Sequence, residues 1–326
     1  MKMLDHIEEL SWAYWKSQVI FAGVELGVFD LLTERSKSSI ETAQELGTNP
    51  RATEMLLNAL VSLGLLKETN GKYENKAYTS EYLVRGRPLY QGARIHHMHN
   101  LWDRWARLQE AVRTGKSVVG DTVTDPRRLE DFMASMHTSG TKKVRLIVKK
   151  FSLKPFKNLL DLGGGPGVYS IEFARANPGL TATVFDLADN IEVAKRCIKE
   201  AGLEDRVLIR VGNCLEVGLG HEEYDVVFVS NLVHIYAPET NIGILKKCYE
   251  ALESGGKVVI HDFLLDSSGA GPLFPALFSL CMLLGTCEGA SYGKKDLETW
   301  LLKAGFKRPR AVRLDKDSGL VIGEKQ

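Results

Sequence analysis

The sequence has few of the features that mark secreted, metal-binding or membrane proteins. Its five cysteines are scattered over 326 residues without a C-x-x-C pair, which argues against a disulfide framework and a thiolate metal site. The longest strongly apolar stretch, 273–284, is about half a membrane span and contains a proline. The first ten residues carry charges and no apolar signal core. We therefore expect a cytoplasmic protein with no bound metal and no membrane partner.

An excess of charge is also missing. The 42 basic and 41 acidic residues leave a net charge of +1, so there is no overall attraction to nucleic acid or to anionic membranes. The length predicts two domains, and a chain of this size buries enough surface to need no covalent staples. These absences favour a small-molecule partner over nucleic acid.

Four glycines in one short segment are the most informative feature that is present. The apolar run 158–162 ends in Gly163-Gly164-Gly165-Pro166-Gly167, and an amphipathic segment follows at 168–175. This pattern predicts a buried strand, a tight turn and the start of a helix. Because glycine has no Cβ, backbone N–H groups of such a turn can approach a ligand closely. A tight turn without a ligand is the alternative.

An acid follows the next apolar run. Asp186 lies 23 residues after Gly163, where an acid at a strand tip can accept hydrogen bonds from ribose hydroxyls. No lysine follows the glycines, which excludes a P-loop, and Val168 stands where a nicotinamide-binding turn needs its last glycine. Asp161 would oppose a pyrophosphate, but it suits a cationic ligand. S-adenosylmethionine, with its sulfonium and ammonium groups, fits this pattern.

Six short motifs of the second half occur in a characteristic order. They are 161–167, 185–187, 212–214, 231–236, 255–257 and 304–306. With them, residues 158–323 resemble the catalytic domain of class I S-adenosylmethionine-dependent methyltransferases. The chain is most similar to the small-molecule O-methyltransferase family of plant caffeate and flavonoid enzymes, hydroxyindole O-methyltransferase and bacterial antibiotic-pathway enzymes. The resemblance implies an α/β fold, a Rossmann-like sheet preceded by an all-helical winged-helix dimerisation domain, and a homodimer.

The resemblance also implies which residues bind the cofactor. The glycine turn would surround the methionine part, and Leu187 would lie against the adenine. Asn213 stands where the family usually has an aspartate that contacts the adenine amino group, and Cys214 would pack on the ring. Ordinary strand-end packing is the alternative for Leu187 and Cys214. The predicted cofactor-binding residues are Asp161, Gly163, Gly165, Gly167, Asp186, Leu187, Asn213 and Cys214.

His234 is the candidate general base. It follows the apolar run 225–229, so we expect it at the rim of the cofactor cleft, and histidine titrates near neutrality. A packed or helix-capping histidine is the alternative. In the resembled family this position holds the catalytic base, and an acid 28 residues later orients it, which is Asp262 here. A second family acid falls on Ser291, and Glu288 could replace it only if the loop rearranges.

The N-terminal half predicts a helix within 11–32, two helices in 39–66 and a hairpin at 67–78. This winged-helix order allows DNA binding or dimerisation, and we favour dimerisation because 51–66 carries only Arg51 as a base. The predicted segments are a dimerisation and substrate-lid domain at 1–115, a helical bridge at 116–150 and the S-adenosylmethionine-binding catalytic domain at 151–326.

Two questions stay open at this stage. His96, His97 and His99 invite a metal-site interpretation, but on a helix they face different directions, so pocket-lining, packed or solvated roles are favoured. The acceptor is expected to be a small aromatic or enolic molecule, because the candidate lining residues are apolar or aromatic. Methyl transfer to carbon, nitrogen or sulfur, and a cofactor-sensing DNA-binding protein, are the alternatives. The candidate lining residues are Trp102, Tyr236, Phe274, Phe278 and Met282.

Overall fold

The computed structural model describes residues 3–119 and 126–326, which form two compact units. The first unit contains the chain up to Trp102 together with Arg127–Ser135. The second contains the described residues of Asp103–Pro126 together with Met136–Gln326. Of the bridge predicted at 116–150, residues 120–125 lie outside the described residues, and the remainder is largely one helix, α9 (Pro126–Lys150).

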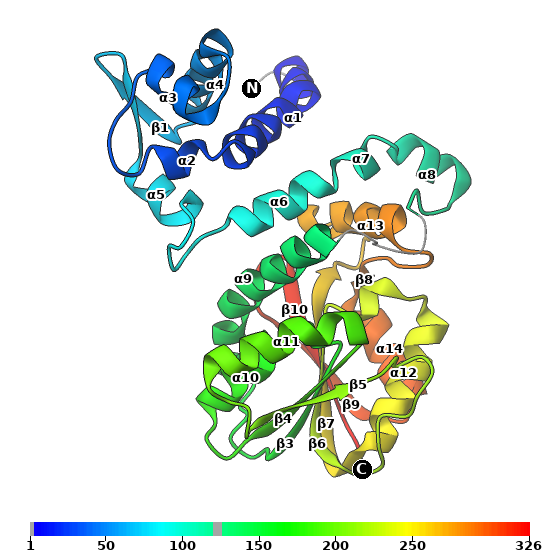
Figure 1. Cartoon of the computed structure of the whole chain (residues 1–326). Helices are drawn as coiled ribbons and strands as arrows, with labels where there is room; N and C mark the ends of the chain where they lie inside the picture. Colours follow the sequence, from blue (N-terminus) through cyan, green and yellow to red (C-terminus); the bar gives the residue numbers. More distant parts are fainter. Residues whose placement is uncertain (1–2, 120–125) are drawn as a thin grey trace. The chain divides into compact units, whose positions relative to one another are not determined.

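Up to Trp102, the first unit is helical apart from one hairpin, and this part is coloured dark blue to cyan in Figure 1. The predicted order of helix, helix and wing is confirmed. Asn49 caps the second of the two helices, and Asn70 and Gly71, both with positive φ, make the hairpin turn. Its elements are α1 (Met3–Glu25), α2 (Val28–Leu31), α3 (Ser39–Leu46), α4 (Pro50–Ser62), β1 (Leu66–Thr69), β2 (Lys72–Asn75), α5 (Ala77–Leu83) and α6 (Gly92–Asn100).

The helix predicted within 11–32 is interrupted. Gly27 has φ 75° between α1 and α2, a left-handed conformation that ends a helix and that glycine adopts without steric cost. Apolar periodicity continues through this break, because both helices pack on one core that includes Val24, Val28 and Phe29. Periodicity alone therefore could not locate the boundary.

The second unit is built on a mixed sheet with the strand order β5-β4-β3-β6-β7-β10-β9, and β8 pairs with β7. The strands from β3 to β7 run parallel, whereas β10 and β9 are antiparallel. The strands are β3 (Asn158–Leu162), β4 (Thr181–Asp186), β5 (Val207–Val211), β6 (Tyr224–Ser230), β7 (Leu252–Leu265), β8 (Tyr292–Gly293), β9 (Lys307–Arg313) and β10 (Ser318–Glu324). The strand predicted at 158–162 is present with the expected bounds.

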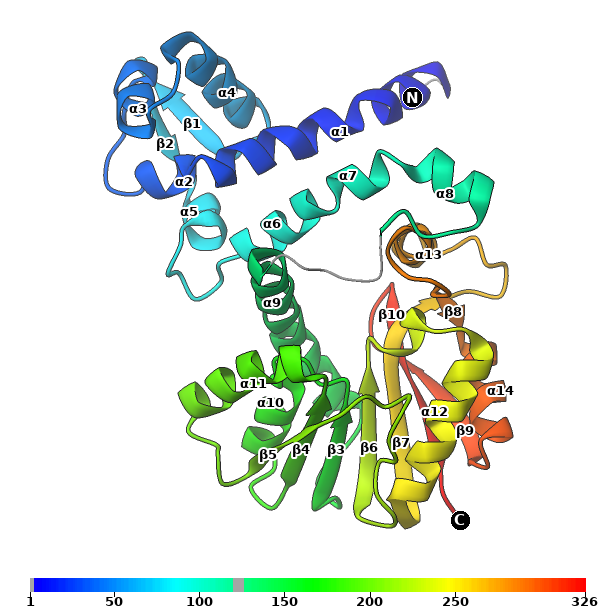
Figure 2. The ribbon, with the colours of Figure 1, turned by 45° about the vertical axis from the view of Figure 1, so that its right-hand side comes forward.

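Helices cover both faces of this sheet, as Figures 1 and 2 show. On one face, α9 and α10 pack with Leu159 of β3, and α10 and α11 pack with Val184 of β4. On the other face, α12 and α14 pack on Leu160 and Leu162. The helices of this part are α7 (Trp102–Trp105), α8 (Leu108–Thr114), α10 (Val168–Ala176), α11 (Ala188–Ala201), the 3₁₀ turn η1 (Val233–Ile235), α12 (Pro238–Ala251), α13 (Leu273–Gly285) and α14 (Lys294–Lys303).

This arrangement decides where a site can form. Parallel strands end at a common edge, and ligands of such sheets bind beyond the carboxyl ends, near the point where the strand order reverses. Here the order reverses between β3 and β6. The glycine turn follows β3, Asp186 ends β4, and η1 follows β6. The predicted cofactor and base residues therefore gather along one edge of the sheet.

Candidate active site

The glycine turn is tightly folded over the end of β3. Gly163 and Gly167 have φ 70° and 73°, and the Gly163 N–H donates to the carbonyl oxygen of Phe185 at 2.8 Å. A Cβ on Gly164 would lie 2.9 Å from the carboxyl carbon of Asp161, too close for any larger residue. The turn thus needs glycine for its backbone conformation and for its contact with the acid beneath it.

Asp161 is fully buried under this turn. The Ser170 hydroxyl donates to its Oδ2 at 2.7 Å, while Oδ1 is buried without a hydrogen-bond partner. Burial raises the pKa of this carboxyl to about 7, only partly offset by the Ser170 hydrogen bonds. A buried acceptor without a partner is costly, and a cationic N–H donor from a ligand would satisfy it.

Asp186 is more heavily hydrogen-bonded than the sequence indicated. Its Oδ2 accepts from the Gly165 N–H at 2.7 Å, and its Oδ1 accepts from the Leu187 N–H and the Asn190 amide, both at 2.7 Å. A carboxylate offers about four lone-pair positions, so roughly one remains for a ligand hydroxyl. Asp186 therefore orders the glycine turn and keeps limited capacity for a ribose.

The residues predicted around the adenine follow β4 and β5. The Leu187 side chain is 50% exposed, which leaves it available for a planar ring. The Asn213 side-chain Oδ1 accepts from the Leu215 N–H at 3.0 Å, and its side-chain amide donates to Glu216. Cys214 is buried, and burial raises the pKa of its thiol. Burial likewise raises the pKa of the neighbouring Tyr236 hydroxyl, to about 12, and the Cys214 thiol adds to that rise.

His234, in η1, lies against Asp262 of β7. The His234 Nδ1 lies 2.8 Å from Oδ1 and 3.1 Å from Oδ2 of Asp262, and both side chains are buried. The Phe263 N–H also donates to Asp262 Oδ1, at 2.7 Å. A carboxylate in this position fixes the proton on Nδ1 and leaves Nε2 as the acceptor. The pair can therefore take a proton from a ligand.

The position of the second acid in the resembled family is not filled by a carboxylate. Ser291 is buried with an unpartnered hydroxyl oxygen, and Glu288 is exposed. Within residues 3–119 and 126–326, Asp262 is the only acid bonded to the His234 ring. The loop has not rearranged to bring Glu288 to the histidine.

His261 points to the opposite face from Asp262, as strand alternation requires. Its Nδ1 lies 2.8 Å from the Ser230 hydroxyl, and burial lowers its pKa to about 4. Two residues with close contacts in this region were not predicted from the sequence. Asn241 hydrogen-bonds to η1, the turn that carries His234 and is called the base turn below, and Ser170 hydrogen-bonds to Asp161. Neither residue belongs to a local sequence motif that could have identified it.

An aromatic cluster contacts the base through one of its rings. The Phe278 ring meets the His234 ring edge-on, with centroids 4.9 Å apart. Phe263 and Phe274 complete a cluster with Phe278 at centroid distances of 4.9 to 5.9 Å. Trp102 belongs to the first unit, where it contacts Tyr14. Of the predicted lining residues, the structure therefore brings Phe278 directly to the base.

The three histidines of α6 are engaged within the first unit. The Nδ1 atoms of His96 and His99 lie 2.7 and 3.3 Å from the same Glu25 oxygen, and His97 contacts Phe132. No group of three potential metal ligands occurs among the described residues. No helix of residues 3–119 and 126–326 has the length and apolar character needed to span a bilayer.

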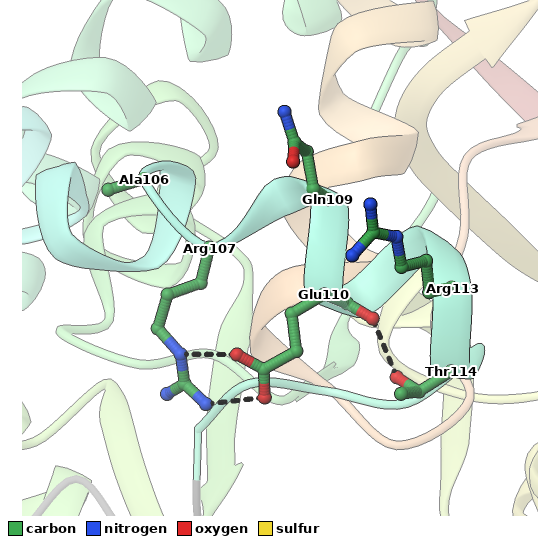
Figure 3. A pocket seen from close by; sticks show the side chains of 6 residues that line it. All are labelled: Ala106, Arg107, Gln109, Glu110, Arg113 and Thr114. Atoms are coloured by element: carbon green, nitrogen blue, oxygen red, sulfur yellow. Dashed lines mark hydrogen bonds and ion pairs between the residues drawn. The ribbon is translucent and has the colours of Figure 1, made fainter.

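A surface pocket on α8 is separate from this site. Figure 3 shows its lining, in which Arg107 and Glu110 form an ion pair at 2.7 Å. None of the predicted site residues lines it.

Comparison with known proteins decides the family. The O-methyltransferase domain model matches residues 105–307, and the O-methyltransferase dimerisation domain model matches 8–85. The chain belongs to the O-methyltransferase family. This O-methyltransferase is 34% identical to 3-hydroxy-5-methyl-1-naphthoate 3-O-methyltransferase of Streptomyces sahachiroi, over 98% of this chain and 94% of that one. It is 32% identical to acetylserotonin O-methyltransferase of Bos taurus, over 98% and 97%.

A solved structure has the same fold over the whole chain. Human N-acetylserotonin methyltransferase in complex with S-adenosylmethionine superposes with a TM-score of 0.91 at 27% identity, covering 100% of this chain and 98% of that one. The protein is therefore an S-adenosylmethionine-dependent methyltransferase with a Rossmann-like catalytic fold. The unpartnered oxygen of Asp161 and the glycine turn, which a Cβ would obstruct, fit this cationic cofactor.

Proposed function

We propose that this O-methyltransferase methylates the hydroxyl of a flat, apolar small molecule, phenolic or enolic, with His234 as general base. The observation that carries the proposal is the buried His234–Asp262 pair beside the aromatic cluster. A phenol has a pKa near 10, so its proton must be removed for efficient attack at neutral pH. A well-placed base contributes about 10²–10⁴-fold to such a step.

The chain's own residues divide this work. Asp262 holds the His234 Nδ1–H, so that Nε2 accepts the acceptor's proton, and its negative charge stabilises the imidazolium that forms. The Phe278 ring packs edge-on against the imidazole and contributes to its burial. Bound S-adenosylmethionine supplies an electrophilic methyl carbon on a sulfonium. The acceptor oxygen, deprotonated by His234, is the nucleophile.

We assign cofactor-binding roles to residues at the carboxyl edge of the sheet. Asp161 and the turn that contains Gly163, Gly165 and Gly167 would hold the methionine part, with Asp161 opposite its cationic groups. The remaining lone pair of Asp186 would accept from the ribose. The adenine would lie against Leu187 and Cys214, and the second lone pair of the Asn213 oxygen would accept from its amino group.

The acceptor class follows from the surroundings of the base. Phe263, Phe274 and Phe278 present ring faces and edges and no charge, which suits a planar aromatic molecule better than a sugar or a phosphate. The relatives' names point to hydroxynaphthoates and hydroxyindoles as a first panel.

We also propose a homodimer. The first unit matches a dimerisation domain model, and one side of α1 carries large apolar residues that are exposed in the single chain. Ile7 and Leu10 are 56% and 63% exposed, and a second copy would cover them. We retain the division into a dimerisation and lid segment at 1–115, a bridge at 116–150 and a catalytic segment at 151–326.

The test is a His234→Ala variant assayed with the acceptor panel and labelled S-adenosylmethionine. We expect cofactor affinity to persist while turnover falls by about 10²–10⁴-fold. His221→Ala, at an exposed histidine, is the matched control and should be fully active. Near-normal turnover of His234→Ala would show that His234 is not the general base. A labelled methyl group on a carbon, nitrogen or sulfur atom of the product would show that the methylated atom is not a hydroxyl oxygen.

A further inference from the structure

The short turn that carries His234 has little internal support. η1 spans three residues, and one backbone hydrogen bond closes it, from the Ile235 N–H to the Leu232 carbonyl at 3.0 Å. A 3₁₀ turn of this length has poor hydrogen-bond geometry, and no adjoining helical turns stabilise it cooperatively. Its shape must therefore be imposed by the residues around it.

Asn241 makes contacts on both sides of the base. Its side-chain amide donates to the Val233 carbonyl at 2.8 Å and to the Tyr236 carbonyl at 3.0 Å, so one NH₂ group spans the turn. Two carbonyl partners require the nitrogen at this position, which fixes the orientation of the amide. Asn241 is 1% exposed, and its own oxygen is buried without a partner.

Asn241 is itself held rigidly. It lies in the first turn of α12, and its N–H donates to the Ala237 carbonyl at 3.0 Å. The helix packs on the core beneath the sheet through Ile244, Leu245 and Cys248. The rigid helix therefore holds the Asn241 amide in a fixed position, and the base turn is hydrogen-bonded to that amide.

The opposite side of the turn is held by two further hydrogen bonds. The Ala290 N–H donates to the His234 carbonyl at 3.0 Å, and the Tyr292 hydroxyl donates to the Tyr236 carbonyl at 2.7 Å. Neither of these donors bonds to the Val233 carbonyl. Among the hydrogen bonds of the described residues, Asn241 is its only donor. Asn241 is thus the side chain that fixes the start of η1, one residue before the imidazole.

We propose that Asn241 is a positioning residue for the methyl-transfer reaction: it sets the place of the His234 imidazole against Asp262 and makes no contact with the reactants. This inference rests on the proposed role of His234 as base. Reaction rates depend steeply on such placement, because a displacement of about 1 Å can lower turnover by about 10²-fold. An unpartnered amide oxygen is tolerated because the two N–H donors hold the turn.

The experiment compares Asn241→Ala with a matched control, Asn177→Ala. The Asn177 amide also bridges two carbonyls, of Leu153 and Phe156, but at the amino-terminal edge of the sheet. With a 3-hydroxynaphthoate as acceptor, we expect Asn241→Ala to lower kcat by about 10²-fold, while the KM of the acceptor and the affinity for S-adenosylhomocysteine stay unchanged. Asn177→Ala should lower thermal stability and leave kcat unchanged. Asn241→Ser, which keeps one donor, should fall between.

A double-mutant cycle separates placement of the base from general damage. In a His234→Ala background, Asn241→Ala should cause no further loss of turnover, because residues that act as a unit are not additive. A full additional loss there, or an equal loss of kcat in Asn177→Ala, would overturn the inference and leave the base proposal intact. Near-normal turnover of His234→Ala alone would overturn both.

A spectroscopic measurement needs no acceptor. The Nδ1–H of an imidazole bonded to a carboxylate gives a downfield proton resonance. That resonance should disappear in His234→Ala, broaden or shift in Asn241→Ala and persist in Asn177→Ala. An unchanged resonance in Asn241→Ala would contradict the inference.

Discussion

Replacing Asp262 by asparagine should strongly impair the enzyme, because it removes the negative charge beside His234. Asp262 Oδ1 accepts from the Phe263 N–H at 2.7 Å and lies 2.8 Å from the His234 Nδ1, so the oxygen of the new amide should stay at this position. The NH₂ group then replaces Oδ2, 3.1 Å from the same Nδ1, where it opposes the Nδ1–H donor to donor. The neutral amide also cannot stabilise the imidazolium that forms when Nε2 takes the acceptor's proton.

The expected loss equals most of the general-base contribution, about 10²–10⁴-fold in kcat, or about 3–5 kcal/mol of transition-state stabilisation. Steady-state kinetics with a hydroxynaphthoate, alongside calorimetry with S-adenosylhomocysteine, separates this loss from a loss of cofactor binding, which we expect to be unaffected. The control is Asp225→Asn, because Asp225 accepts backbone N–H groups of Lys157 and Asn158 at the other end of the sheet. If Asp262→Asn turned over as fast as the native enzyme, the orienting role would be refuted.

Three further predictions concern the cofactor and the dimer. Because burial raises the pKa of Asp161 to about 7, the folded protein retains a proton that the unfolded chain releases from about pH 4 upward. The free energy of unfolding of the cofactor-free protein should therefore fall between about pH 4 and 7, and Asp161→Asn should remove this dependence in unfolding curves at pH 5 and 8. Asp186→Ala should weaken S-adenosylhomocysteine binding by at least about tenfold in calorimetry, since it removes a charged acceptor and loosens the glycine turn at Gly165. The double variant Ile7→Asp, Leu10→Asp should be monomeric by analytical ultracentrifugation; a dimer like that of the exposed control Glu8→Ala would exclude the α1 surface.

Local patterns in the sequence predicted much of the catalytic fold. A parallel strand buried on both faces is a short apolar run, and glycine at positive φ leaves few alternatives for the chain, so the region from β3 to the start of α10 could be predicted closely. The boundary at Gly27 was missed, because the hydrophobic period is the same on both sides of it. Spacing along the chain, read with the family resemblance, also paired His234 with Asp262, and their side chains lie within 2.8 Å.

Only the tertiary structure determined the burial and the hydrogen-bond partners of the site residues. The sequence by itself determined which residue types stand at the carboxyl edge of the sheet. It could not determine that Asp161 is sealed with one unpartnered oxygen, that Asp186 is already bound by three donors, or that Asn241 holds the base turn. Burial and hydrogen-bond partners depend on elements far apart in the chain that meet only after folding, whereas strand and turn preferences are set by neighbours a few residues away.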